Sequence, residues 1–274
     1  MASSDAVFFY RAVTGASFST FFSTLVVGQT LMTDPRSCKR YLELLHNRLS
    51  PYLGDISDGQ ESSDFEWTVL PSFDLMGHYI DLHEIRLTKS SFKIIVQSKA
   101  NLGSITHVRY LMLARASRQI ENAFIAWLEM FLDTTLRAVN IKPPTLVRFL
   151  NKFFYEYIKN SDIHPGGIAL EFLLKKKNLK RVSITLENDD CQKFIDLATS
   201  TDRQFSEIFF DHILKATGVK FRNLQLTKVA CKIGILSHEG RVKFYLGKQP
   251  SQWQINFIRF WIAELAFQIW KNEE

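Results

Sequence analysis

SRQIENAFIAWLEMFLDTTLRAV, residues 117–139, carries the strongest helical pattern of the 274-residue chain. Its large apolar residues recur at spacings of four, three and four, which places them on one face of a helix. These residues are Ile120, Phe124, Trp127 and Phe131. Ser117 precedes the pattern as a capping residue, and Pro143 and Pro144 follow it. We therefore predict a helix that runs from Ser117 to Val139.

The region before this helix predicts strands. Three runs are rich in β-branched and aromatic residues and are separated by Pro71, Gly77 and Gly103. The runs are Phe65–Leu70, Phe92–Gln97 and Val108–Ala114. We expect them to form an antiparallel meander, preceded by a solvated loop over Gly54–Asp64.

The region after the helix mixes helices and strands. An apolar stripe of Leu146, Phe149, Leu150, Phe153 and Tyr157 predicts a helix from Thr145 to Lys159. Strands are expected at Ile168–Leu174, Val182–Leu186, Lys228–Leu236 and Arg241–Leu246, the last two as a hairpin across residues 237–240. Further helices are expected from Asn188 or Asp189 to Thr199, from Phe205 to Thr217 before Gly218, and from Gln252 to Trp270.

These elements predict an α+β fold. We expect an antiparallel sheet flanked by helices, with a carboxyl-terminal β-hairpin and a long final helix. Residues 1–165 would form an amino-terminal region and residues 166–274 a carboxyl-terminal dimerisation region, unless the two form one continuous domain.

The final helix is apolar on nearly every side, so it must be covered twice. Its own sheet would cover one face, and either more of this chain or a second protein would cover the other. The strand Arg241–Leu246 poses the same choice, because it could stay within one sheet or pair with a strand of another chain.

Composition limits the class of protein. The three cysteines, Cys38, Cys191 and Cys231, are widely spaced and include no CxxC pair, which favours a reducing compartment over a disulfide framework. The uncharged run from Ala12 to Thr33 contains eight Ser or Thr residues, so we expect strands and turns there, with a membrane anchor as the alternative.

Residues for catalysis, metal binding or nucleotide binding do not come together in the sequence. His78 and His83 are five residues apart, a spacing that suits neither a helical zinc motif nor one face of a strand. Cys191 follows Asp189 and Asp190, whose charges raise the pKa of a thiol. We therefore predict a non-enzymatic binding protein without metal or cofactor; a hydrolase or transferase would need a cleft built from distant residues.

Positive charge is concentrated between Arg137 and Arg181. Ten basic and three acidic residues give this segment a charge of +7, against +6 for the whole chain. A solvated turn explains the lysine cluster as well as a phosphate-binding surface does. For the second interpretation, the candidate DNA-binding residues are Lys142, Arg148, Lys152, Lys175, Lys176, Lys177, Lys180 and Arg181.

Several segments resemble centromere protein L, a subunit of the constitutive inner kinetochore. In the carboxyl-terminal third they are Leu226–Val229, Ser237–Phe244 and Ala263–Ile269. Upstream they are Phe124–Trp127 with Asn140–Ile141, Val182–Leu186 and Tyr41–Leu45. The chain lacks the disordered amino-terminal extension of the animal members, so we expect a compact fungal-type member.

The resemblance implies a curved antiparallel sheet, a nuclear location at the centromere and no chemistry. It also implies a heterodimer with a centromere protein N-like subunit, and assembly with other inner-kinetochore subunits on centromeric chromatin or DNA. The predicted partner interface is Val242, Phe244, Leu246, Phe257 and Trp261. The alternative is a free-standing basic nucleic-acid-binding protein.

Overall fold

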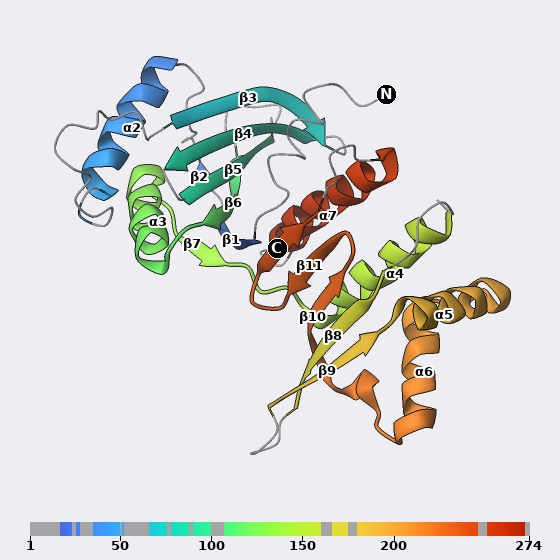
Figure 1. Ribbon diagram of the computed structural model, residues 1–274. Coiled ribbons are helices and arrows are strands. Elements are labelled where there is room, and N and C mark those ends of the chain that lie inside the picture. Colours follow the sequence, from blue (N-terminus) through green and yellow to red (C-terminus); the bar gives the residue numbers. More distant parts are fainter. Residues whose placement is uncertain are drawn as a thin grey trace. The chain divides into compact units, whose positions relative to one another are not determined.

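The computed structural model describes residues 17–23, 26–27, 35–49, 51, 66–75, 78–87, 90–99, 107–159, 166–174, 180–245 and 251–271. They belong to two compact units (Figure 1). Unit 1 is drawn from Met1–Val139 and Ala266–Glu274, and unit 2 is Asn140–Leu265. Each unit combines helices with antiparallel strands, which confirms the predicted α+β class. The domain boundary that we expect after residue 165 stays a prediction.

The sheet of unit 1 contains the predicted meander and two strands that the sequence pattern does not predict, β4 (His78–Leu87) and the short β7 (Leu136–Ala138). Its strand order is β3 (Glu66–Leu75), β4, β5 (Ser90–Lys99), β6 (His107–Arg115) and β1 (Ser17–Ser23). The short strands β2 (Val26–Val27) and β7 pair with β6 and β1. Strand β4 lacks a clear alternation because His83, Glu84 and Ile85 are all buried.

Two helices, α2 (Pro35–Leu49) and α3 (Arg118–Leu132), complete the core of unit 1 (Figure 1). The rings of Phe92 on β5 and Phe124 on α3 stack at 3.7 Å between centroids. Tyr41 on α2 packs 5.4 Å from Trp67 on β3. These contacts make the apolar face of α3 part of the core, as its spacing predicts.

Helix α3 ends earlier than predicted. Asp133 adopts the left-handed conformation, with φ of 48°, and its N–H donates to the carbonyl of Glu129. The Glu129 side chain then accepts a hydrogen bond from the Leu136 N–H at 2.7 Å. The prediction of a helix to Val139 is therefore wrong, because a short polar residue tolerates the left-handed cap and releases the chain into β7.

The sheet of unit 2 has the strand order β12 (Arg241–Phe244), β11 (Gly234–Ser237), β10 (Gln225–Cys231), β8 (Ile168–Leu173) and β9 (Arg181–Leu186). A single strand over Lys228–Leu236 is a wrong prediction, because the chain turns after Cys231 and pairs back on itself at Gly234. The apolar pattern continues through this turn, so it hides the break.

Four helices and a short 3-10 turn complete unit 2. Among the described residues they are α4 (Pro143–Lys159), α5 (Asn188–Thr201), α6 (Phe205–Thr217), η3 (Phe221–Asn223) and α7 (Gln252–Lys271), of which α7 belongs to unit 2 only as far as Leu265. The predicted stripe of α4 is buried throughout. Helix α6 has the predicted bounds, and Gly218, with φ of 71°, donates its N–H to the carbonyl of Leu214 at 2.8 Å. Pro143 and Pro144 thus begin a helix rather than end one.

Helix α7 is covered by its own chain over its first four turns. Its buried residues there are Ile255, Phe257, Ile258, Trp261, Ile262 and Leu265. The ring of Phe149 on α4 lies 5.3 Å from Phe257 and 4.9 Å from Trp261. Within the described part of the chain, no helix has the length and apolar character to cross a bilayer.

Candidate nucleic-acid interface

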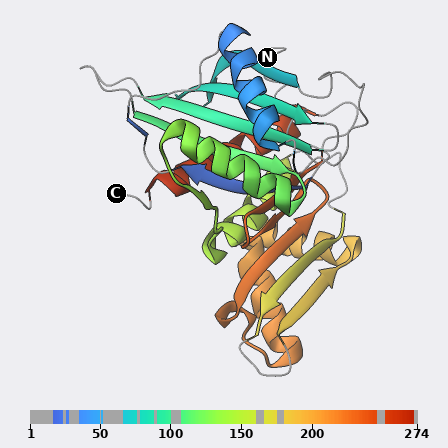
Figure 2. The same ribbon diagram turned by 90° about the vertical axis from the view of Figure 1, so that its left-hand side faces the viewer.

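One face of the sheet of unit 2 packs on helices, and the other carries charge. Leu170, Phe172, Leu226, Val229, Val242 and Phe244 are buried on the first face. The alternating positions point the other way, as strand geometry requires. We call this second surface the open sheet face, and its charged residues are Glu171, Arg181, Lys228, Arg241 and Lys243. In Figure 2 the yellow and orange strands lie in front of the helices α5 and α6.

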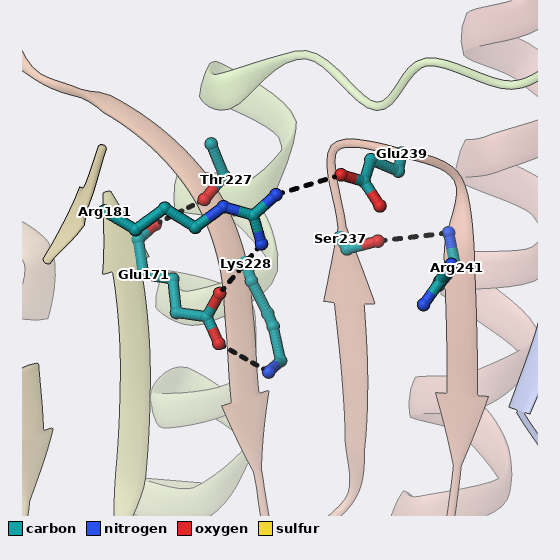
Figure 3. A network of polar contacts seen from close by, with 7 residues as sticks. All are labelled: Glu171, Arg181, Thr227, Lys228, Ser237, Glu239 and Arg241. Carbon is teal, nitrogen blue, oxygen red and sulfur yellow. Dashed lines mark hydrogen bonds and ion pairs between the residues drawn. The ribbon is translucent and has the colours of Figure 1, made fainter. Parts of the chain in front are cut away.

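A row of polar residues crosses the open sheet face from strand to strand. Ser183 lies opposite Glu171, Glu171 opposite Lys228, and Lys228 opposite Ser237. The Arg241 N–H donates to the Ser237 hydroxyl at 3.2 Å and extends the row to β12 (Figure 3). The row therefore joins five strands that are distant in the sequence.

A β-bulge in β10 sets this arrangement. Leu226 pairs with Phe172 and Lys228 with Glu171, so Thr227 is the extra residue. Its hydroxyl donates to the Glu171 carbonyl at 3.0 Å, and its carbonyl accepts from the His238 N–H at 2.7 Å. The bulge thus places Lys228 on the open sheet face and returns Val229 to the core.

Ion pairs organise the cations (Figure 3). Lys228 Nζ lies 2.6 Å from Glu171 Oε1, and Arg181 lies 4.0 Å from Glu171 and 3.3 Å from Glu239. The Arg181 side chain stays 61% exposed despite both contacts. Over these described residues, four cations and two carboxylates leave a net charge of +2, to which the neighbouring exposed Lys180 adds one more.

A row of mainly uncharged side chains lies beside the polar row. In register across β9, β8, β10 and β11 come Thr185, Ala169, Ala230 and Ile235, and Lys243 follows on β12. The Lys243 ammonium lies 4.8 Å from the centre of the Tyr245 ring. Up to Lys243 this row carries no charge, and the cations of the polar row lie along one side of it.

The predicted DNA-binding residues do not form one patch. Lys180 and Arg181 lie at the start of β9, on the open sheet face. Arg148 and Lys152 lie on α4, which packs on β10 from the buried face. Arg148 pairs with Glu264, and Lys152 pairs with Glu156 at 2.6 Å.

The remaining predicted cations are Lys142 and the lysine cluster. Lys142 is exposed next to Ile141, whose carbonyl lies 2.8 Å from His238 Nδ1 and whose N–H donates to the His238 carbonyl. It therefore adjoins the β11–β12 turn. Lys175, Lys176 and Lys177 fall outside the described residues.

The predicted partner-interface residues are core residues where the structure describes them. Val242 and Phe244 are buried on the helix side of β12, and Phe257 and Trp261 pack on α4. Leu246 lies outside the described residues. A role of these side chains in pairing would thus be to position β12 and α7.

Three cations of the open sheet face escape the sequence analysis: Lys228, Arg241 and Lys243. Lys228 stands alone in β10, and Arg241 and Lys243 are separated by Val242 in β12, so they form no charge cluster in the sequence. The available signal is alternation in β12, where Arg241 and Lys243 flank the apolar Val242. In β10 the bulge removes even that signal.

Other reactive groups are held in structural roles. The His83 ring is buried, and its Nδ1 accepts a hydrogen bond from Trp67 Nε1 at 3.1 Å. Burial, together with the charges of Asp190 and Glu187, raises the pKa of the Cys191 thiol to about 11. Burial also raises the pKa of Cys231 to about 12. The described residues contain no group of His, Cys, Asp and Glu side chains that could hold a metal ion.

Comparison with known proteins connects this architecture to a family. A family model described as Centromere protein L matches residues 86–265, about two thirds of the chain. No curated protein matches the chain. The matched range contains both the open sheet face and α4, and it agrees with the resemblance found in the sequence. The chain therefore belongs to the centromere protein L family, whose members are structural subunits of the kinetochore.

Proposed function

We propose that this chain forms a one-to-one heterodimer with a centromere protein N-like subunit and helps to anchor the inner kinetochore on centromeric DNA. Its family makes it a kinetochore subunit that acts at the centromere, in the nucleus, in chromosome segregation and cell division. The proposal adds a specific partner and a DNA-contacting surface to that role.

The cations of the open sheet face are the observation that supports DNA contact. Proteins bind DNA mainly by placing Lys and Arg against phosphates, which releases counterions from the duplex. Arg181, Lys228, Arg241 and Lys243 lie on three strands of one sheet. The small side chains of Thr185, Ala169 and Ala230 beside them would let a phosphate backbone approach the sheet.

The existing ion pairs are compatible with this role. Exposed pairs contribute about 0–1 kcal/mol each, so exchanging the Glu239 carboxylate for a phosphate costs Arg181 little. Glu171 is less exposed and contacts both Arg181 and Lys228. Glu171 would thus hold the two cations in position while their exposed sides face the duplex.

Charge reversal on the open sheet face tests the DNA contact. We expect Arg241→Glu with Lys243→Glu to lower the affinity for a 30-base-pair duplex at least about tenfold, measured by fluorescence anisotropy. The slope of log K against log salt should become shallower by roughly one per lost phosphate contact. Lys193→Glu with Lys215→Glu, on α5 and α6, is the matched control.

Equal loss of affinity in both double variants would contradict a site on the open sheet face. A separate triple variant, Lys175→Glu with Lys176→Glu and Lys177→Glu, tests the cluster predicted from sequence charge. Circular dichroism should show the same thermal midpoint for all of these proteins.

The heterodimer is tested by co-expression with the centromere protein N-like subunit of the same organism. Light scattering on the purified sample should give the mass of one copy of each chain. The charge-reversed variants should keep this mass, because they change an exposed surface. A sample in which each protein elutes at its own mass would contradict the heterodimer.

The alternative function is a free-standing nucleic-acid-binding protein, and the same basic face supports it. The two proposals differ in what the chain does alone. An anchoring subunit should bind DNA more tightly as a heterodimer, since the partner adds surface. A chain whose DNA affinity is unchanged by the partner would favour the alternative.

A further inference from the structure

A groove runs along α4 within unit 2, away from the open sheet face. Its volume is about 690 Å³. Along α4 its lining residues recur every three or four positions, at Pro144, Arg148, Asn151, Tyr155 and Ile158. The rest of the lining comes from the end of α5 and the turn into α6 on one side of α4, and from Phe260 of α7 beside Lys152. We call this the α4 groove.

The floor of the α4 groove is apolar and firmly packed. Phe154 stacks on Phe205 with 3.5 Å between ring centroids, and both rings are buried. Asn151 links the two sides, because its Oδ1 accepts from the Ser206 N–H at 3.0 Å and its Nδ2 donates to Gln204 Oε1 at 2.7 Å. The groove is therefore preformed.

Exposed apolar side chains line its α4 wall. Tyr155 is 50% and Ile158 37% exposed. The Tyr155 ring has two ammonium groups near its face, those of Lys152 at 5.2 Å and Lys159 at 4.3 Å from the centroid. A half-exposed aromatic ring that is held in this way is a typical interface anchor.

The charge of the lining is mainly positive. Arg148, Lys152 and Arg203 line the α4 groove, with Asp202 as the acidic residue among the described lining positions. Carboxylates that pair with these cations, such as Glu264 and Asp211, are not part of the lining. A ligand in the groove would thus meet apolar groups in the middle and cations along the sides.

We propose that the α4 groove binds an amphipathic helix of another protein, with apolar side chains toward the groove and Asp or Glu along its flanks. The lining from Pro144 to Ile158 extends for about 21 Å at about 1.5 Å per residue, which matches a helix of about four turns. Such a helix would present apolar residues at i, i+3 or i+4, i+7 and i+11. The flanks of the bound helix should carry Asp and Glu, because these carboxylates would complement the charges of Arg148, Lys152 and Arg203.

A displayed library of random 16-residue peptides, selected against the full chain, tests this proposal. We expect the enriched peptides to share apolar residues at helical spacing and a net negative charge. Their affinity, measured by fluorescence anisotropy, should fall at least about tenfold for Ile158→Ser and for Lys152→Glu. A peptide with its acidic residues changed to Lys should bind wild type at least about tenfold more weakly.

Matched variants lie outside the groove. Leu214→Ser removes an apolar side chain of α6 with the same 37% exposure as Ile158, and Lys193→Glu reverses an exposed lysine of α5. Both should leave peptide affinity unchanged. The proposal is overturned if no peptide is enriched, if the groove and control variants lose affinity equally, or if the enriched peptides carry no excess of acid. It is also overturned if light scattering finds a homodimer that Ile158→Ser dissociates.

Discussion

At the scale of single residues, the surroundings of Cys191 determine the reactivity of its thiol. Its side chain is buried at the start of α5 and contacts the Leu186 carbonyl at 3.9 Å. Desolvation, the largest cause, and the nearby Asp190 and Glu187 charges raise its pKa from 9.0 to about 11. Since the thiolate is the nucleophile, Cys191 stays protonated and inert at neutral pH.

This environment predicts both reactivity and pH dependence. In a Cys38→Ser background, iodoacetamide at pH 7.5 should modify neither Cys191 nor Cys231 in the native protein, and both in urea. A raised folded-state pKa favours the protonated form, so its stabilising contribution is complete below pH 9 and lost as the pH rises toward 11. Urea titrations of Cys191→Ala should lack that part of the decline; rapid native alkylation would contradict the assignment.

Two glycines are required for different reasons: Gly234 because a side chain has no space there, and Gly218 because its backbone conformation is unfavourable for other residues. A Cβ on Gly234 would lie 2.6 Å from the Lys243 carbonyl oxygen, which is a backbone atom of the paired strand. A Cβ on Gly218 meets nothing within 4 Å, but its φ of 71° disfavours other residues. We expect Gly218→Ala to lower the free energy of unfolding by about 1–2 kcal/mol.

Gly234→Ala should cost more, about 2–3 kcal/mol, because β11 and β12 must move apart. Urea denaturation measures both values. A cost for Gly234→Ala below that for Gly218→Ala would show that the two strands separate easily.

At the scale of elements, local signals separate the correct predictions from the wrong ones. Helix α6 could be predicted at both ends because Gly218 is a local stop signal. The carboxyl-terminal end of helix α3 could not be predicted, because Asp133 ends the helix only through its left-handed conformation. Strand β4 could not be predicted either, because His83, Glu84 and Ile85 are buried in succession, which removes the alternation of buried and exposed positions.

The candidate site also contains some residues that could be predicted from the sequence and others that could not. Arg181 could be found from the sequence because it adjoins a charge cluster. Lys228, Arg241 and Lys243 could not, since strand register and a bulge bring them together. Likewise, no pattern in α4 alone shows that Tyr155 and Ile158 lie in a groove, because α5, α6 and α7 supply the rest of its lining.

The link between α4 and α6 gives a prediction about element packing. Asn151→Ala removes the acceptor for the Ser206 N–H in the first turn of α6 and should lower the free energy of unfolding by about 1–2 kcal/mol. Asn151→Asp keeps that acceptor and should recover part of the loss. Asn122→Ala on the exposed side of α3 should change stability by less than about 0.5 kcal/mol. Equal stability of all three variants in urea would contradict the link.

At the scale of the whole molecule, each unit has its own aromatic core. Phe124 stacks on Phe92 in unit 1, whereas Phe149 contacts Phe257 and Trp261 in unit 2. The two cores thus join different strands and helices. The chain should respond to core truncation locally before it responds globally.

Phe149→Ala should cost about 3–5 kcal/mol and raise hydrogen exchange in β8, β10 and α4 more than in β4, β5 and β6. Phe124→Ala should give the opposite distribution. Mass spectrometry of exchanged peptides measures both. An equal rise across the two units for either variant would show that they unfold as one cooperative body.

The bulge at Thr227 has a consequence for how this sheet can change in evolution. Before Thr227 the side chains of β10 alternate in one phase, and after it they alternate in the opposite phase. Deleting this one residue would leave Leu226, Lys228 and Val229 in plain alternation on their present faces, whereas losing a residue elsewhere in β10 would exchange the faces of every residue beyond it. The length of β10 is therefore free to change by one residue at Thr227, at the cost of its hydrogen bonds to the Glu171 carbonyl and the His238 N–H, and lineages should gain or lose a codon there more readily than elsewhere in the strand.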